Sequence, residues 1–234
     1  MTFDFHDTIA VAPRWFLLET RALPTAVLAL LGAAGEVTWD PANDGAVTDA
    51  YRAMRGEVAA TGAERDALTG TQHALHAVGI ALPDETVAPA IDRVMAEALA
   101  EAHPRPGIQE AVRMLANLGV PLAVISSAVY HPFLEWCLEA WELRDDFVVV
   151  VSSASCGYYK SHPGIYHCAL SALGRAPHEV IHVGDSYRYD VEAAHALGMQ
   201  TVWVNLKGEQ RAENVADLTV PDLIGLAPRL LELA

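Results

Sequence analysis

The sequence predicts an α/β protein with a doubly wound parallel sheet, into which a long helical segment is inserted near the start. From residue 108 to residue 205, short apolar runs alternate with segments of helical periodicity, the pattern of a parallel α/β sheet. Two of these runs, Leu122–Ile125 and Phe147–Val151, contain no polar alternation, as expected for strands covered by helices on both faces. Before residue 103, by contrast, apolar residues recur at helical intervals without any clear strand pattern.

The first half of the chain is expected to contain a very short apolar start before Asp4 and then four helices. Prolines and glycines interrupt the helical periodicity and so mark the ends of these helices. The helices are expected at Trp15–Leu31, Ala46–Ala60, Glu64–Val78 and Asp84–Ala102. The stretch His103–Gly107 contains two prolines and a glycine, and is therefore interpreted as a linker.

The second half is expected to alternate helix and strand. The first and third helices are each followed by a glycine, a common helix terminator. The predicted helices are Ile108–Leu118, Pro132–Ala140, Gly164–Leu173 and Asp190–Leu197. The predicted strands are Pro121–Ser126, Phe147–Val151, Glu179–Val183 and Thr201–Asn205.

Composition excludes several classes of partner. The 234 residues are 52% hydrophobic and carry a formal net charge of −15, a surface that repels nucleic acid and anionic lipid. The longest apolar stretch, around Ala26–Ala34, is about half of the ~20 residues that cross a bilayer, so no membrane span is expected. The acidic N-terminus is unlike a secretory signal, and the three cysteines lack CxxC spacing. We therefore expect reduced cysteines and a cytoplasmic protein, of unknown oligomeric state.

Polar clusters stand where the apolar runs stop. They are Asp4–Thr8, Ser126–Ser127, Lys160, and Gly184–Ser186 followed by Asp190. Taken singly, each is explained as a helix cap, a turn or a solvated side chain. Together they should meet, because the carboxyl ends of parallel strands share one edge of the sheet, where α/β proteins bind ligands.

In this order, the clusters resemble the four motifs of the haloacid dehalogenase (HAD) superfamily. Those motifs are an Asp with a Thr four residues later, a Ser or Thr at a strand end, a Lys, and a loop with two Asp. Here they are Asp4 with Thr8, Ser126, Lys160, and Asp185 with Asp190. Pro commonly follows the Lys in this family, whereas Ser161 and His162 intervene before Pro163 here. The resemblance implies a Rossmann-like core of residues 1–12 and 103–234 and a helical cap of residues 13–102.

The resemblance also implies a hydrolase that uses Mg²⁺ to act on a small phosphate ester. Asp4 would be the nucleophile and would form an aspartyl phosphate, while Lys160 would offset the charge of the phosphate. Ser126, Ser127 and Lys160 would bind the phosphoryl oxygens. The expected metal ligands are Asp4, Asp185, Asp190 and the main-chain carbonyl of His6, since Mg²⁺ prefers oxygen.

His6 departs from the phosphatase pattern, which has a second Asp two residues after the nucleophile. That Asp is the acid for the leaving group and then the base for water. An imidazole can in principle perform both transfers, but a filling and hydrogen-bonding role for His6 explains the residue equally well. Asp7 is interpreted as a turn or capping residue.

Two alternatives to a phosphatase stay open. Dehalogenases of 2-haloacids also lack the second Asp and need no metal, although they usually carry Ser-Asn before the last Asp, where this chain has Gly-Asp-Ser. A catalytically impaired member that binds a phosphorylated ligand or a protein partner is the other alternative. A phosphonatase is a poor fit, because that branch uses a cap lysine and the only lysines here are Lys160 and Lys207.

Other residues carry weaker signals. His73 and His76 lie on one helix face without a third ligand, and His182 within a strand is interpreted as a hydrogen-bonded core residue. Six helical residues are candidates for substrate contact, although amphipathicity and solvation explain them as well. They are Arg14, Trp15, Phe16, Arg21, Arg52 and Arg55.

Overall fold

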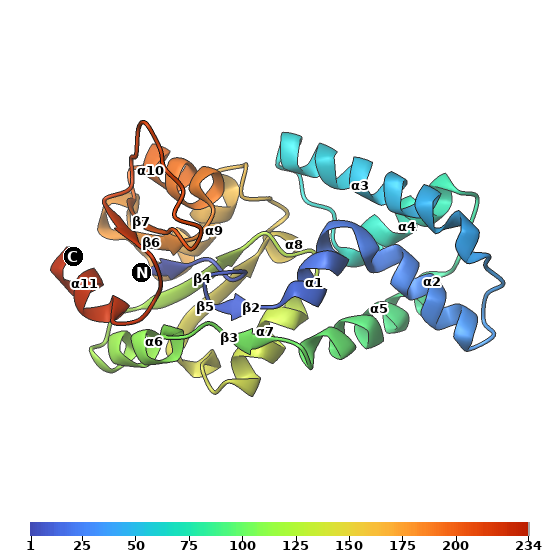
Figure 1. Cartoon of the computed structure of the whole chain (residues 1–234), viewed down its shortest axis with the longest axis horizontal. Coiled ribbons are helices and arrows are strands. Elements are labelled where there is room, and N and C mark those ends of the chain that lie inside the picture. Colours follow the sequence, from blue (N-terminus) through green and yellow to red (C-terminus); the bar gives the residue numbers. More distant parts are fainter. Residues whose placement is uncertain (234) are drawn as a thin grey trace.

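The computed structural model, which describes residues 1–233, contains a six-stranded sheet in the order β5-β4-β1-β6-β7-β8 (Figure 1). All neighbouring strands are parallel, and Thr2 in β1 pairs with Ala123 on one side and His182 on the other. The strands are β1 (Thr2–Phe3), β4 (Leu122–Ser126), β5 (Phe147–Ser152), β6 (Ile181–Gly184), β7 (Gln200–Val204) and β8 (Leu218–Val220). The predicted doubly wound parallel sheet is confirmed.

Helices cover both faces of this sheet. Val124 of β4 faces the cluster formed with α6, α7 and α11, while the next residue, Ile125, faces a second cluster formed with α9 and α10. The alternation explains why the strand sequence is apolar throughout. The helices are α6 (Ile108–Asn117), α7 (His131–Ala140), α8 (Ser153–Cys156), α9 (Gly164–Leu173), the π-helical η5 (Tyr187–Glu192), α10 (Ala193–Ala196) and α11 (Leu226–Leu233), with short 3-10 turns at η3 (Arg144–Asp146) and η4 (Pro177–Glu179).

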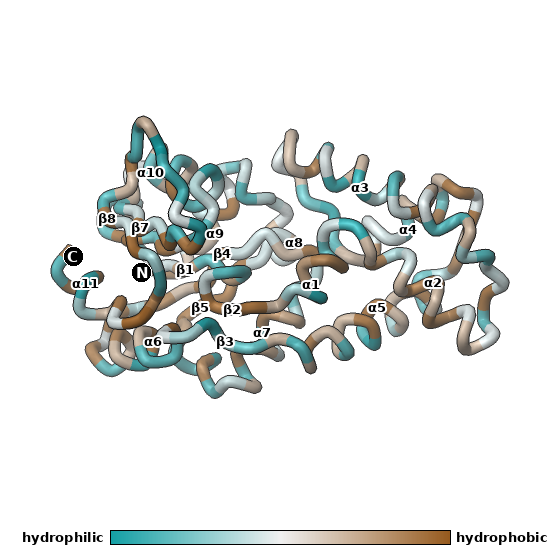
Figure 2. The backbone as a smooth tube through the Cα atoms, viewed as in Figure 1, coloured by the Kyte–Doolittle hydropathy of each residue, from teal (hydrophilic) through white to brown (hydrophobic). Residues whose placement is uncertain are grey.

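The helical segment forms a separate layer of helices beyond the edge of the sheet (Figure 1). Its apolar residues converge in the middle of the bundle, where Val27, Leu28, Tyr51 and Leu75 are completely buried. Figure 2 shows hydrophilic residues in teal alternating with hydrophobic residues in brown along these helices. The helices are α1 (Pro13–Leu17), the π-helical η1 (Leu18–Ala22), α2 (Leu23–Ala33), the 3-10 turn η2 (Pro41–Asn43), α3 (Asp44–Thr61), α4 (Ala67–Ala77) and α5 (Asp84–Leu99).

Two short strands connect the helical layer to the sheet. β2 (Ala10–Val11) pairs with β3 (His103–Pro104) in antiparallel fashion. The stretch that the sequence suggested as a linker therefore starts with a two-residue strand. Neither strand could be predicted, because each consists of two residues and depends on a partner about 90 positions away.

α1, η1 and α2 form one helical run, Pro13–Ala33, that is long and apolar enough to cross a membrane by length and composition. No such segment was expected from the sequence, because the longest uninterrupted apolar stretch is short. The helical run is longer because it also includes the charged residues Arg14, Glu19 and Arg21. In the structure α2 packs against α3, α4 and α5, and its residues Leu23, Val27 and Leu28 are fully buried. A core helix of a helical bundle has this same apolar composition.

Candidate active site

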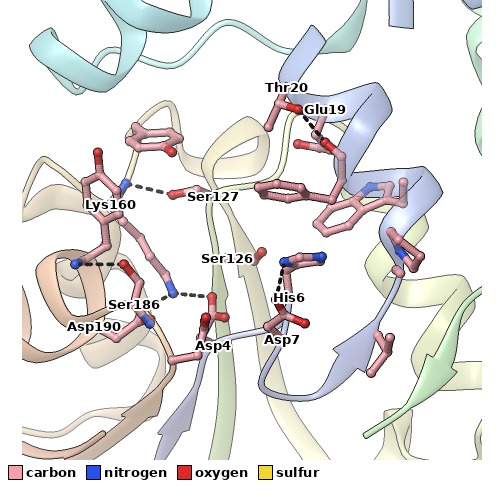
Figure 3. Close-up of a pocket in the computed structure, with 18 of the residues that line it drawn as sticks. Asp4, His6, Asp7, Glu19, Thr20, Ser126, Ser127, Lys160, Ser186 and Asp190 are labelled. Carbon is pink, nitrogen blue, oxygen red and sulfur yellow. Dashed lines mark hydrogen bonds and ion pairs between the residues drawn. The ribbon is translucent and has the colours of Figure 1, made fainter. Parts of the chain in front are cut away.

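The polar clusters meet at the carboxyl edge of the sheet, as the parallel topology requires (Figure 3). Asp4 directly follows β1, Ser126 is the last residue of β4, and Asp185 directly follows β6. Lys160 comes from the loop between α8 and α9, and Asp190 from η5. Thr8 is buried in the loop between β1 and β2. Residues that are far apart along the chain thus form a single cluster in space.

Lys160 joins two of the carboxylates. Its side chain is only 3% exposed, and its Nζ donates to Asp4 Oδ1 and, at 2.6 Å, to Asp190 Oδ1. Burial alone would lower the pKa of Lys160, but the charges of Asp190 and Asp4 outweigh burial and raise it above its usual range. The ammonium group therefore stays charged and supplies a fixed positive charge beside Asp4.

Three carboxylates crowd around this one ammonium group. Oxygen atoms of Asp4, Asp185 and Asp190 all lie within 4.8 Å of one another. Burial, followed by the charges of Asp4 and Asp190, raises the pKa of Asp185 to about 8. Burial and the charge of Asp190 raise the pKa of Asp4 to about 7 despite Lys160. When all three carboxylates are ionised, their negative charge exceeds the positive charge of Lys160 by two, which a divalent cation would neutralise.

Asp190 is the carboxylate whose surroundings most strongly favour the ionised form. Burial alone would raise its pKa, but Lys160 and His182 outweigh burial and lower it to about 2. His182 Nε2 lies 3.2 Å from Asp190 Oδ1, and the other ring nitrogen lies 2.9 Å from the Thr2 hydroxyl. His182 is therefore a hydrogen-bonded core histidine, as the sequence indicated, and it also orients Asp190.

Gly184 makes room for Asp190. A Cβ atom on residue 184 would lie 2.3 Å from Asp190 Cγ, closer than any side chain could tolerate. The backbone N–H of Ser186 donates to Asp190 Oδ2 at 2.9 Å. The Gly-Asp-Ser sequence at the end of β6 therefore brings the carboxylates of Asp185 and Asp190 to one place.

Two serines face the same cluster. Ser126 is 2% exposed and lines the cavity together with Ser127. The hydroxyl of Ser127 accepts a hydrogen bond of 3.1 Å from the backbone N–H of Lys160. This bond connects the end of β4 to the loop that carries the lysine. The two hydroxyls and Lys160 thus form a group of donors next to Asp4, suited to an oxyanion.

His6 lies above Asp4, toward the helical layer (Figure 3). Its ring stacks on Phe16 with 4.3 Å between the ring centroids, and its Nδ1 lies 3.8 Å from Asp7 Oδ2. Burial lowers the pKa of His6, the charge of Asp7 raises it, and the charge of Arg105 lowers it further. Asp7 has a positive φ of 59°, as expected of a turn residue, and accepts a hydrogen bond of 2.5 Å from Arg105.

The helical layer closes over these groups and leaves a cavity of about 620 Å³. Hydrogen bonds fix the layer to the sheet domain: Tyr159 N–H donates to Gly62 O at 2.9 Å, and Tyr130 OH donates to Asp92 at 2.6 Å. The cavity is lined from the sheet side by Asp4, His6, Asp7, Ser126, Ser127, Tyr159, Lys160, Asp185, Ser186, Tyr189, Asp190 and Lys207, from the connecting segment by Val11 and Ala12, and from the helical side by Pro13, Trp15, Phe16, Glu19, Thr20 and Arg55.

Glu19 is a cavity residue that sequence reasoning missed. Its carboxyl group is buried, and its Oε2 accepts a hydrogen bond of 2.8 Å from Val129 N–H, which links η1 to the loop after β4. Within residues 1–233, no group donates to its Oε1. Burial raises the pKa of Glu19 to about 8, although Val129 N–H and the nearby Arg55 oppose this. The only signal in the sequence was a glutamate directly after Leu17 and Leu18 in a predicted helix.

We expect Glu19→Gln to stabilise the protein increasingly as the pH rises. The folded pKa of Glu19 is about 8, well above its usual range, so the contribution of this carboxyl group to the free energy of unfolding is fully present at acidic pH and is lost as the pH rises. The amide keeps an acceptor for Val129 N–H and never ionises. Urea unfolding should show a gain of about 3 kcal/mol at about pH 8 relative to about pH 5. A stability difference that is constant between these two pH values would contradict the raised pKa.

Most of the other residues that the sequence suggested make contacts away from the carboxylates, although Trp15 also lines the cavity. His73 and His76 are both exposed, and Arg14 pairs with Glu97 and Glu101. Trp15 is buried against Phe133, with its ring stacked at 5.0 Å. The three cysteines, Cys137, Cys156 and Cys168, are free, as expected.

Comparison with known proteins agrees with this arrangement. A family model described as haloacid dehalogenase-like hydrolase matches residues 2–198. The chain is 35% identical over 130 residues to haloacid dehalogenase-like hydrolase domain-containing protein 3 of Xenopus laevis, covering 52% of this chain and 52% of that protein. It is 35% identical over 149 residues to a phosphoserine phosphatase of Thermus thermophilus, covering 61% of this chain and 59% of that protein.

The chain thus spans about half the length of the curated relatives it matches. Among solved structures, it resembles a 2-haloacid dehalogenase from Pseudomonas syringae with a TM-score of 0.71 and 20% identity, over 100% of this chain and 98% of that chain. This similarity shows the shared fold. The family model covers most of the chain, and the chain therefore belongs to the haloacid dehalogenase-like hydrolase family.

Proposed function

We propose that this protein is a Mg²⁺-dependent phosphomonoesterase for a small phosphorylated metabolite. The observation that carries the proposal is the cluster of three carboxylates, Asp4, Asp185 and Asp190, with Lys160 bound between two of them. This cluster has an excess of negative charge that a divalent cation would neutralise, and it contains a nucleophile. A dehalogenation that needs no metal gives the carboxylate of Asp185 no role.

Asp4 is the proposed nucleophile. Its carboxylate attacks the phosphorus atom, the bond from phosphorus to the ester oxygen breaks, and the alcohol leaves with a proton. Water then attacks the phosphorus of the aspartyl phosphate, which releases inorganic phosphate and restores the Asp4 carboxylate. Lys160 lowers the repulsion between the Asp4 carboxylate and the incoming anion.

The metal would be held by the carboxylates of Asp4, Asp185 and Asp190 and by the main-chain carbonyl of His6. The three carboxylates fit Mg²⁺, because they offer hard oxygen ligands and two uncompensated charges. When bound, the ion supplies positive charge that stabilises the transferring phosphoryl group. Ser126, Ser127 and Lys160 would donate hydrogen bonds to the phosphoryl oxygens.

His6 is proposed to transfer the proton to the leaving group and from the attacking water. Its ring occupies the side of Asp4 that faces the helical layer, and Phe16 and Asp7 hold its orientation. The leaving group must extend toward that layer, since Asp4 and the sheet close the other side. This placement suits a proton donor, although imidazole replaces the carboxyl group that is usual in the family.

We expect His6→Ala to lower turnover of alkyl phosphates by about 10²-fold or more, the usual contribution of general acid–base catalysis. His6→Asp should preserve or raise this activity, because a carboxyl group can perform the same two transfers. Aryl phosphates should respond less, since a good leaving group needs little protonation. Steady-state hydrolysis of an alkyl and an aryl phosphate by the parent and both variants measures the difference. Equal alkyl phosphate turnover in the parent and His6→Ala would show that His6 fills space.

Hydrolysis of a panel of phosphorylated metabolites and a 2-haloacid, with Mg²⁺ and with excess EDTA, tests the proposed function. We expect phosphate release that requires Mg²⁺. Release of halide in EDTA would favour the dehalogenase alternative. Binding of a phosphorylated compound without turnover would identify a catalytically impaired member. Full phosphatase activity in EDTA would contradict the metal dependence.

The proposal includes a division of labour within the chain. Residues 13–102 would act as a cap that selects the leaving group, while residues 1–12 and 103–234 would form the catalytic core; Ala234 lies outside the described residues. The hydrogen bonds between Gly62 and Tyr159 and between Asp92 and Tyr130 support a cap that closes over the site. A cytoplasmic location and a small-molecule substrate belong to the same proposal.

A further inference from the structure

A second hollow lies directly beside the catalytic cavity. We call it the arginine groove; it has a volume of about 540 Å³ and is lined by Pro13, Phe16, Leu17, Thr20, Arg21 and Arg52. Pro13, Phe16 and Thr20 also line the catalytic cavity, so the two spaces share a wall. A leaving group that passes Phe16 on its way out of the cavity would enter this groove.

Two cations from different elements face this groove. Arg21 belongs to η1 and Arg52 to α3, and within residues 1–233 neither forms an ion pair. Two other arginines that lie near the catalytic cavity are neutralised: Arg14 pairs with Glu97 and Glu101, and Arg55 pairs with Glu64. In a chain with a net charge of −15, two uncompensated guanidinium groups at one hollow form a local site of positive charge.

The groove also presents an apolar surface between its arginines and the catalytic cavity. Phe16 is 48% exposed and Leu17 is 38% exposed, although both are large apolar residues. One face of the Phe16 ring is covered by His6, next to the proposed nucleophile. The path from Asp4 outward therefore runs from a polar site, past apolar side chains, to a pair of cations.

We propose that the arginine groove binds a second anionic group on the leaving group of the substrate. The preferred substrates would be phosphate monoesters with an apolar spacer and a distal anion, of which a phosphate best matches two guanidinium groups. This inference rests on the proposed phosphatase function and deepens it, since it names the class of ester. Arg21 and Arg52 would then determine specificity, and neither would touch the reacting phosphoryl group.

Paired substrates test this proposal. Each alkanediol bisphosphate, from ethanediol to octanediol, is compared with the alkyl monophosphate of the same chain length, and para-nitrophenyl phosphate serves as a reference for basal turnover. We expect at least one bisphosphate to have a kcat/KM about 10-fold or more above that of its monophosphate, mainly through a lower KM, because paired guanidinium contacts to phosphate are strong. The preference should weaken as the salt concentration rises.

The variant Arg21→Gln/Arg52→Gln should bring the ratio of the two kcat/KM values close to one. Arg93→Gln is the matched control, because Arg93 is an exposed arginine of α5 that forms no ion pair within residues 1–233 and lines neither hollow. The Arg93→Gln variant should show the same ratio of bisphosphate to monophosphate kcat/KM as the parent. If the parent hydrolyses monophosphates but prefers no bisphosphate, the proposed role of the arginine groove is wrong, while the phosphatase function stands. A preference for bisphosphates that survives the double substitution would have the same meaning. No hydrolysis of any ester, para-nitrophenyl phosphate included, would reject the phosphatase function and this inference with it.

Discussion

Asp4→Asn is expected to lose at least about 10⁴-fold in the turnover of every phosphate ester that the parent hydrolyses, the scale seen when a covalent nucleophile is removed. An amide oxygen does not attack phosphorus at a useful rate. The substitution removes one of three crowded carboxylates and leaves an oxygen that can still accept from Lys160. The variant should therefore fold and have a free energy of unfolding no lower than that of the parent.

The control for this experiment is Asp145→Asn. Asp145 is an exposed carboxylate in η3, just before the amino end of β5 and so at the opposite edge of the sheet. It should retain parental turnover. The comparison of phosphate release with urea unfolding for both variants separates a chemical defect from a folding defect. Residual activity of Asp4→Asn within tenfold of the parent would mean that another group attacks the phosphate.

Lys160→Met has the second largest expected effect, and it should lower both activity and stability. The ammonium group is the buried partner of Asp4 and Asp190, so its loss leaves two buried carboxylates without a cation. Breaking such a pair costs about 3–5 kcal/mol in the free energy of unfolding. Turnover should fall by about 10²–10³-fold, because a fixed charge no longer stabilises the phosphoryl oxygens.

Lys207→Met provides the matched control, since Lys207 is the other lysine of the chain and is an exposed residue of the same cavity. It should unfold at the urea concentration of the parent and change turnover by less than about tenfold. Equal stability of the parent and Lys160→Met would contradict the proposed electrostatic role. Urea unfolding and steady-state phosphate release are measured for the parent and for both variants.

The sheet and the polar cluster could be predicted because their signals are local. The runs Leu122–Ile125 and Phe147–Val151 are apolar for the length of a strand, and both are followed by serines at the carboxyl edge. β1, by contrast, has two residues, and its position followed from the resemblance carried by Asp4 and Thr8. β8 and α11 were not predicted, since a three-residue strand such as Leu218–Val220 has no distinct period.

The cavity was less predictable, because its walls come from distant parts of the chain. Glu19 is buried only because η1 docks on the loop after β4, and no periodicity reports that contact. The role of His182 in holding Asp190 depends on parallel pairing of β1 with β6, which also brings Thr2 to the other ring nitrogen. The π-helical turns η1 and η5 each carry two residues that line the cavity, and nothing in the sequence distinguishes them from ordinary helix.

If Asp4 is the nucleophile, it carries the phosphoryl group during the reaction. Trapping this group on the protein is the most direct test. The parent is mixed with Mg²⁺ and an excess of para-nitrophenyl phosphate, quenched in acid within the first turnovers, and digested for mass spectrometry. We expect a phosphoryl group on the peptide that contains Asp4, removable by hydroxylamine, and none in Asp4→Asn. Turnover without a labelled peptide, or a phosphoryl group on Ser126 or any residue other than Asp4, would contradict the account.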